Sequence, residues 1–284
     1  MSFVAVAKKD FKDSVRSRWL WVLTVLFVLF TAGIAYAFSI LQGGGANEEL
    51  TTLGLLFFLQ SPAALLVPII ALVISYKAIV GERESGSIRL LLSLPHTRRD
   101  MVLGKIIGRS LSIGLAVITG FAVALLVILW RYAEFDAVAY LLFVAITLLF
   151  ALTYIAVGIG MSSLVSSGSR ALAAAVGFWV LFEFLWGAIG FVLYWVTNGF
   201  SLEGLNEGFP DWIQFVQSIA PGTAYSNSVV ALLPEDPTAN LGGGAASTDP
   251  PIYLENEVGI LILLAWLVVL PTLGYLRFRG TDLS

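Results

Sequence analysis

The chain has no cysteine, one histidine and three methionines among its 284 residues. Without cysteine there are no disulfides and no thiolate metal ligands, and so few His and Met side chains argue against a transition-metal site. Charge is also scarce, because Asp, Glu, Lys and Arg together form 12% of the chain, against about a quarter in soluble domains. Hydrophobic residues form 58%, and the mean hydropathy is +0.90. This composition predicts a polytopic membrane protein.

Two further absences argue against ATP binding and against catalysis by this chain. The chain has no G-x-x-x-x-G-K-(S/T) phosphate loop, so we do not expect it to bind ATP itself. Its one histidine, His96, lies beside Pro95 in a charged segment, and a Ser-His-Asp triad or a pair of His ligands would have to be built around it. We therefore expect a non-catalytic chain with no metal site, no cofactor of its own and no nucleic-acid partner.

Apolar runs long enough to cross a bilayer of roughly 30 Å recur along the chain. They lie at residues 19–41, 53–80, 102–130, 137–161, 171–197 and 258–276. The preceding segment, 1–18, has apolar residues at every fourth position and basic residues on another face, which predicts an amphipathic helix at the headgroup level. The expected fold is therefore all-α, with six transmembrane helices in 19–284, an N-terminal amphipathic helix and a short cytoplasmic helix.

Two spans and one loop carry further signals. Gln60, Ser61, Pro62 and Pro68 interrupt the second span, so we expect it either to begin as a short outer helix or to tilt and kink there. Glycines in the fifth span are compatible with a pair of half-helices. In the outer segment 198–257, residues 209–219 are predicted to form an amphipathic interfacial helix. A flexible loop is expected after Pro221, as in residues 235–251, which are rich in Gly, Pro, Ser, Thr and Asp.

The distribution of charge predicts the orientation of these spans. With the N-terminus inside, Arg131 alone among the 16 Lys and Arg residues falls outside, as the positive-inside rule requires. We expect a multi-pass protein of the cytoplasmic membrane with both termini in the cytoplasm. Most acidic residues fall on the outer side instead. This acidic surface has two interpretations: it attracts cations or a basic partner, or it keeps the protein solvated in a salt-loving organism. The scarcity of lysine relative to arginine favours the halophile interpretation.

The charged segment 81–105, GERESGSIRLLLSLPHTRRDMVLGK, separates the second and third spans. Residues 85–94 are predicted to form a short helix that has Ile88, Leu91 and Leu92 on one face and that ends before Pro95. An ordinary charged loop between two spans is the simplest interpretation. The order of the residues suggests more, since they follow the pattern E-x-E-x-G-(S/T)-(I/L)-x-x-L-L-(S/T)-x-P-x-(S/T)-R, with G-K at the head of the next span.

This pattern resembles the cytoplasmic coupling region of type-2 ABC transporter permeases. The resemblance implies that the coupling loop 81–101 docks on a separate ATPase, which holds ATP and Mg²⁺. The residues implied in this contact are Glu82, Glu84, Gly86, Ile88, Arg89, Leu91, Leu92, Pro95 and Arg98. The resemblance also implies a complex of two permease chains, expected to be a homodimer, and two ATPase copies. In such a complex the helix 1–18 acts as a connecting helix.

Within this family, the segments RSRWL (16–20), PIIALVISYKAIVGE (68–82) and 94–105 look most like permeases of nitrous-oxide-reductase maturation. That likeness implies a role in the maturation of a copper enzyme. Because the chain itself lacks a set of copper ligands, the cargo would be a sulfur species or another small molecule rather than the bare metal.

Glu183 is the one ionisable residue clearly inside a predicted span. A carboxyl group there is costly and is expected to face the bundle interior, a water-filled cavity or a partner. It either lies on a substrate or gating path or forms a hydrogen bond to Ser, Thr or Tyr of a neighbouring helix. The alternative function is an ATP-independent ion-coupled carrier or a membrane scaffold that uses Glu183.

Overall fold

The computed structural model describes residues 3–42, 52–86, 97–132, 134–205, 208–233 and 251–280. The described residues form helices and connecting turns, without a strand. The helical stretches that are long and apolar enough to cross a membrane are Arg18–Leu41, Thr52–Glu84, Arg98–Arg131, Ala137–Leu164, Gly168–Thr197 and Val258–Arg279. The predicted all-α membrane fold with six spans is thereby confirmed.

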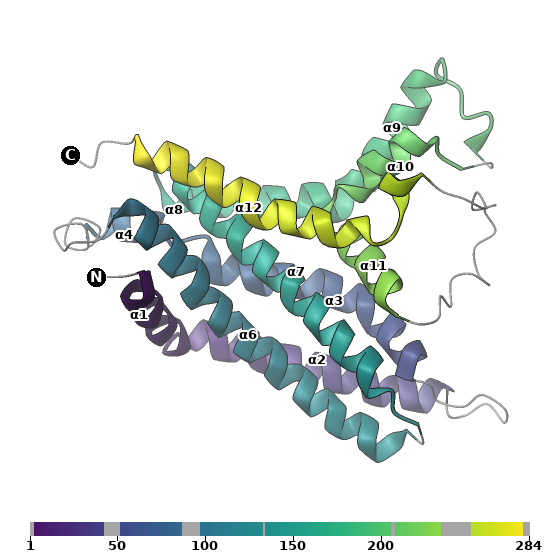
Figure 1. Ribbon diagram of the computed structural model, residues 1–284, viewed down its shortest axis with the longest axis horizontal. Coiled ribbons are helices and arrows are strands. Elements are labelled where there is room, and N and C mark those ends of the chain that lie inside the picture. Colours follow the sequence, from purple (N-terminus) through teal and green to yellow (C-terminus); the bar gives the residue numbers. More distant parts are fainter. Residues whose placement is uncertain are drawn as a thin grey trace.

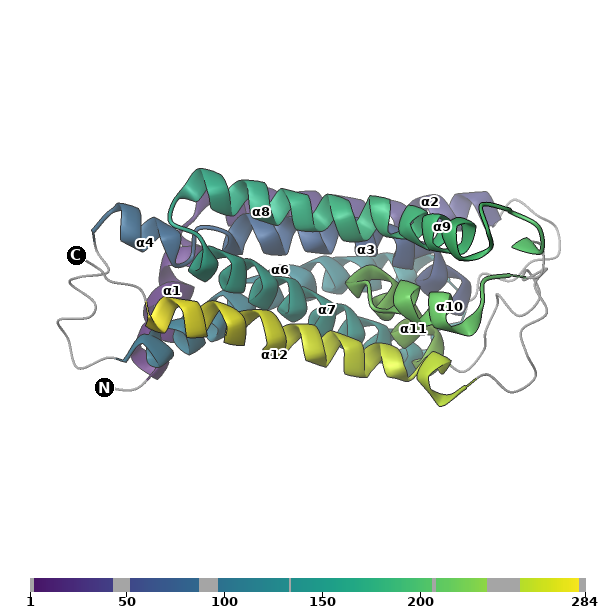
Figure 2. The same ribbon diagram turned by 90° about the horizontal axis from the view of Figure 1, so that it is seen from above.

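The spans run lengthwise side by side (Figures 1 and 2). They are built from α2 (Arg18–Gln42), α3 (Thr52–Ser75), α6 (Arg98–Arg131), α7 (Ala137–Leu164), the α8–α9 helix described below and α12 (Val258–Arg279). Helix α7 is the centre of the bundle, since it packs on α3, α6 and α12. Its side chains Phe143, Phe150 and Tyr154 are fully buried. The apolar core therefore surrounds α7.

The second span breaks at a different place from the predicted kink. Helix α3 continues through Pro62 and Pro68 and ends at Ser75, and a turn at 76–79 leads into the short helix α4 (Val80–Glu84). The Ser162 hydroxyl of α7 accepts hydrogen bonds from the Ile79 and Val80 amides at 3.0 and 3.1 Å. A side chain distant in the sequence thus satisfies backbone donors that the break leaves without helical partners.

Helix α6 begins earlier than the predicted boundary at 102. Thr97 is its N-cap, with the Thr97 hydroxyl accepting from the Asp100 amide and the Asp100 carboxylate accepting from the Thr97 amide, both at 3.1 Å. This reciprocal capping box satisfies two donors of the first turn. The charged residues Arg98, Arg99 and Asp100, together with Met101, therefore belong to the third span's helix rather than to the loop.

The fifth span is a continuous helix rather than a pair of half-helices. It consists of α8 (Gly168–Val180), a π-helical turn η1 (Leu181–Leu185) and α9 (Trp186–Thr197). Figure 1 shows α9 leaning away from the other spans beyond this turn. π-helical turns insert an extra residue into a helix and often mark functional positions. Glu183 lies in the middle of this turn.

The outer segment contains more structure than the sequence predicts. The amphipathic helix expected at 209–219 is α10 (Asp211–Ser218), but Pro221 begins a second helix, α11 (Pro221–Leu232), where the flexible loop was expected to start. The part of that predicted loop at 235–250 lies outside the described residues. Tyr225 of α11 is fully buried and stacks on Phe150 with ring centroids 4.4 Å apart. Its hydroxyl lies 3.0 Å from that of Thr147. Proline at the first helical position and the four-residue spacing of Tyr225 and Val229 were the available signals.

Candidate coupling site

The N-terminal helix α1 (Phe3–Val15) packs directly across α6. Two glycines of α6 permit this contact, because a Cβ atom at Gly104 would lie 2.6 Å from Val6 Cβ and one at Gly108 would lie 2.7 Å from the Ala7 carbonyl oxygen. The face of α1 that is buried carries Val6, Ala7 and Asp10, whereas Phe3 is 40% exposed. The buried face of α1 therefore differs from the face that its apolar periodicity predicts. The buried face includes an acid, Asp10.

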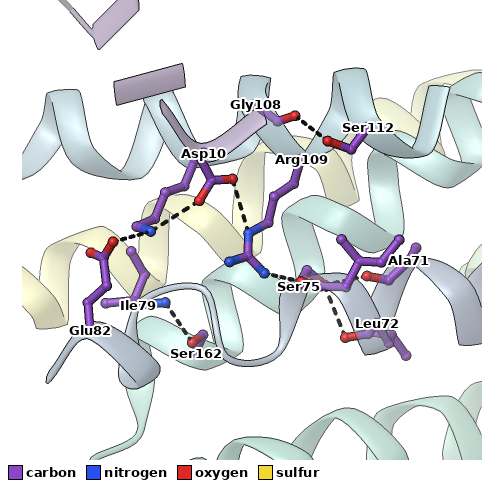
Figure 3. A network of polar contacts seen from close by, with 12 residues as sticks. Asp10, Ala71, Leu72, Ser75, Ile79, Glu82, Gly108, Arg109, Ser112 and Ser162 are labelled. Carbon is purple, nitrogen blue, oxygen red and sulfur yellow. Dashed lines mark hydrogen bonds and ion pairs between the residues drawn. The ribbon is translucent and has the colours of Figure 1, made fainter. Parts of the chain in front are cut away.

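Asp10 belongs to an ion-pair network that joins α1, α4 and α6 (Figure 3). The Lys105 Nζ atom lies 3.2 Å from Asp10 Oδ1 and 2.8 Å from Glu82 Oε1. Arg109, one turn further along α6, donates from Nε to Asp10 Oδ2 at 3.2 Å. Two acids and two bases therefore neutralise one another where the bundle ends.

This network is largely withdrawn from solvent. The Lys105 side chain is 3% exposed and that of Asp10 is 8% exposed. Buried charges of this kind are tolerated only when they are paired, and removal of one partner leaves an uncompensated charge. The network is therefore a geometric constraint, since a relative movement of α1, α4 and α6 would separate buried charges.

The network also reaches the end of α3. Arg109 donates from a terminal guanidinium nitrogen to the carbonyl oxygen of Ile74, in the last turn of that helix. This carbonyl is one of those that a helix leaves without an internal partner. Arg109 thereby fixes the end of α3 directly before the break that leads to the coupling loop.

Glu84, the second acid of the E-x-E pattern, contacts a different helix. Its Oε1 atom accepts a hydrogen bond of 2.7 Å from the Gly168 amide at the start of α8. A carboxylate in this position accepts from an amide that has no partner within its helix, and it interacts favourably with the positive end of the helix dipole. Arg83 adds a 3.1 Å hydrogen bond to the Val165 carbonyl. α4 is thus attached to the beginning of the fifth span.

Arg98 links the far end of the predicted coupling loop to the C-terminal helix. Its guanidinium donates to the carbonyls of Phe278 and of Arg279, the latter at 3.1 Å. It also lies 5.2 Å from the ring centroid of Phe278, which is fully buried. Arg83 approaches the same ring at 5.5 Å. Both ends of the loop therefore meet α12.

The structure describes four of the nine residues predicted for the ATPase contact. Glu82, Glu84 and Arg98 have the intramolecular partners given above, and Gly86 has a positive φ of 71°, which favours glycine. Ile88, Arg89, Leu91, Leu92 and Pro95 lie outside the described residues. Their role in docking stays a prediction.

Sequence reasoning did not assign a role in the site to Asp10 or Arg109. Asp10 follows Val6 and Ala7 at helical spacing and so shares their face, which the structure shows to be buried. An acid on the apolar face of an amphipathic helix was the available signal. Lys105 was matched to the pattern as its final lysine, but its burial in an ion pair was not expected.

Glu183 lies apart from this network, in the π-helical turn of the fifth span. The Tyr154 hydroxyl of α7 donates a 2.6 Å hydrogen bond to Glu183 Oε1. A Cβ atom at Gly222, in the first turn of α11, would come 2.5 Å from Glu183 Oε2. The carboxyl group therefore contacts the central helix α7 and the start of the buried helix α11. This is the kind of hydrogen bond to a neighbouring tyrosine that was one of the two expectations.

Comparison with known proteins identifies the family. The family described as ABC-2 family transporter protein matches residues 4–283. The probable ABC transporter permease NosY of Stutzerimonas stutzeri is 30% identical, with 96% of each chain covered. The corresponding protein of Pseudomonas aeruginosa is 37% identical over 63% of this chain and 66% of its own length. The chain therefore belongs to the ABC-2 transporter family and is a non-catalytic membrane subunit of an ABC transporter.

Proposed function

We propose that the chain is the permease of an ATP-driven transporter and that its coupling loop, 81–101, docks on a separate ATPase subunit. The observation that carries this proposal is the attachment of both ends of the loop to several spans. Glu82 is paired with Lys105 of α6, Glu84 binds the start of α8 and Arg98 binds the end of α12. A force applied at the loop would reach the second, third, fifth and sixth spans together.

In this mechanism the acids of the E-x-E pattern act within the permease. ATP-driven closure of the ATPase pair moves the segment between Gly86 and Thr97. α4 moves with it, because only Ser85 separates Gly86 from the end of α4. The buried ion pairs transmit the displacement to α1 and α6, since separating them would expose unpaired charges in a dry environment. Ile88, Leu91 and Leu92 supply the apolar contact with the ATPase.

The complex is proposed to contain two permease chains and two ATPase chains, with the permease termini in the cytoplasm. From the resemblance of segments 16–20, 68–82 and 94–105 to permeases of nitrous-oxide-reductase maturation, we propose a cargo used in the maturation of a copper enzyme, which would be a sulfur species or another small molecule. An ion-coupled carrier centred on Glu183 is less well supported, because the family match covers nearly the whole chain and Tyr154 already binds the carboxyl group.

The test is purification of the tagged chain from its native membrane in mild detergent, with detection of a co-purifying ATPase. Leu91→Asp places a charge on the proposed docking face and should abolish recovery of the ATPase. Ser169→Asp is the matched control, because it adds the same charge on the same side of the bundle, at an exposed position in the first turn of α8 where an acid is favourable. Equal recovery of the ATPase with both variants, or none with the unmodified chain after cross-linking, would contradict the proposal.

A further inference from the structure

The helices α10 and α11 fold back into the bundle as a helical hairpin. Phe209, just before α10, packs on Phe191 and Tyr194 of α9, with ring centroids 5.1 and 5.8 Å away. Val216, near the end of α10, instead contacts Trp186, the first residue of α9. Because α9 leads away from the π-helical turn, α10 runs back along it toward that turn.

The second arm of the hairpin, α11, lies along a different helix. Gly222, in its first turn, contacts the carboxyl group of Glu183, which accepts a hydrogen bond from Tyr154 of α7. Tyr225, about one turn later, stacks on Phe150, one turn nearer the beginning of α7. α11 therefore runs along α7 away from the π-helical turn, and the tip of the hairpin lies inside the bundle.

The tip of the hairpin, at Ile219, presents backbone groups that need partners inside a membrane bundle. The Ile219 carbonyl accepts a hydrogen bond of 2.9 Å from Trp266 Nε1 of α12. The Val216 carbonyl accepts one of the same length from Trp186 Nε1 of the fifth span. Phe182 packs against both indole rings, with centroids 5.2 and 4.6 Å away. The fifth and sixth spans therefore each bind one side of the tip.

The two arms of the hairpin belong to different groups of helices. α10 lies on α9, whereas α11 packs on α7 and α12 (Figure 1). The second group is closely packed, because a Cβ atom at Gly259 of α12 would lie 2.4 Å from the Ala224 carbonyl oxygen of α11. One at Gly160 of α7 would lie 2.6 Å from the Leu270 carbonyl oxygen of α12. We call the boundary between the fifth span with α10 and the group of α7, α11 and α12 the seam.

The fifth span is held in the bundle by few contacts. In its most apolar stretch 11% of the residues are buried inside the protein, against 67% for α7. Among the described residues, the hydrogen bonds that cross the seam are those of Glu183 with Tyr154 and of Trp266 with Ile219. Glu183 also lies in the π-helical turn, and such turns often mark functional positions. The seam is thus closed at the level of the hairpin tip.

We propose that the seam is a gate, in which the fifth span and α10 move together away from α7, α11 and α12, and that Glu183 and Trp266 hold it closed. This inference rests on the proposed function, in which the coupling loop displaces the start of α8 through Glu84. The displacement acts on the fifth span because that span is the least embedded of the six. An open seam exposes the hairpin tip and gives the cargo a path between the spans.

The test places one cysteine at the tip of a chain that has none of its own. Ser218→Cys lies at the end of α10, where the serine is 6% exposed. The rate at which a water-soluble maleimide labels it is measured on the purified full-length chain in lipid nanodiscs. Trp266→Phe removes the donor to Ile219 and should raise this rate about tenfold, which corresponds to about 1.4 kcal/mol. Glu183→Leu should also raise it, whereas Glu183→Gln, which keeps an acceptor for Tyr154, should not.

Two controls separate opening of the seam from general loosening of the fold. Trp21→Phe removes an indole donor that binds the Val15 carbonyl, far from the seam in the sequence, and should leave labelling of the tip unchanged. Ser112→Cys reports on a fully buried position of α6 and should stay protected in every variant. Unchanged labelling of the tip in the Trp266→Phe and Glu183→Leu variants would overturn the gate. A parallel rise at Ser112→Cys would overturn it as well.

The link to ATP is tested separately, in the complex with the co-purified ATPase. A non-hydrolysable ATP analogue should accelerate the labelling of Ser218→Cys. The measurements on the isolated chain need no ATPase, so their failure overturns the gate and leaves the proposed function standing. If those variants behave as expected but the analogue changes nothing, the gate stands and ATP-driven coupling through the loop is contradicted.

Discussion

Lys105 illustrates how one buried side chain organises the coupling region. Its ammonium group joins Asp10 of α1 to Glu82 of α4, and with 3% of its side chain exposed it has little access to water. A lysine at the head of a span would ordinarily extend to the headgroups. Here the opposite charges on two neighbouring helices hold it inside the protein.

Lys105→Met should destabilise the protein by about 3 kcal/mol, because Glu82 then loses its ammonium partner in a poorly hydrated site. The measurement is the thermal unfolding midpoint of the purified chain in detergent. Lys12→Met is the control, since Lys12 is exposed on α1 and should change stability by no more than about 0.5 kcal/mol. Coincident midpoints of the two variants would show that the network contributes nothing to stability.

Glu183 presents a different case, since its carboxyl group accepts one hydrogen bond from Tyr154. Glu183→Gln keeps an acceptor at that position and should preserve transport and the unfolding midpoint. Glu183→Leu should lower the free energy of unfolding by about 1 to 3 kcal/mol and so lower the midpoint, because it leaves the Tyr154 hydroxyl without its partner in a fully buried site. Loss of transport in the glutamine variant with an unchanged midpoint would instead indicate a charge-dependent role.

The helices α1 and α6 depend on small residues where they cross. Gly104 and Gly108 let the backbone of α1 approach α6 more closely than any side chain would allow. Without that approach, Asp10 could not come within hydrogen-bonding distance of Lys105 and Arg109. These two glycines of the third span thus serve the contact with the N-terminal helix.

Gly104→Ala should therefore displace α1, since the new methyl group would lie 2.6 Å from Val6 Cβ and 2.9 Å from the Phe3 carbonyl oxygen. We expect a destabilisation of about 1 to 3 kcal/mol and faster amide hydrogen exchange throughout α1. Gly114→Ala, in the same helix, is the control. Its methyl group would meet only Leu148, at 4.0 Å, and alanine favours the helix by up to about 1 kcal/mol. Unchanged exchange in α1 of the Gly104 variant would contradict this account.

At the level of the complete bundle, the polar connections are unequal at its two ends. The ion pairs, the break between α3 and α4, and both ends of the coupling loop lie at the end that carries α1 and α4 in Figure 1. The buried helix α11 and the amphipathic helix α10 lie toward the other end. The proposed coupling site and the buried helix α11 therefore lie toward opposite ends of the bundle.

This arrangement predicts the orientation in the membrane, with α1 and the end of α12 in the cytoplasm. The absence of native cysteine makes the measurement direct. A membrane-impermeant maleimide applied to intact cells should label Leu202→Cys but should label Lys12→Cys and Gly280→Cys only after permeabilisation. Labelling of either terminal position in intact cells would reverse the proposed orientation and remove the coupling loop from contact with a cytoplasmic ATPase.

Composition and local pattern were sufficient to predict the spans, the amphipathic α1 and the family, because these depend on hydrophobicity and on contiguous motifs such as residues 81–105. Tertiary packing alone brought Lys105 to Asp10, which precedes it by 95 positions, placed Glu84 at the start of α8 and buried α11 beside α7. These contacts depend on how each helix is rotated against its neighbours. A linear pattern specifies which faces are apolar, but the partner of a buried charge is determined only when those faces meet.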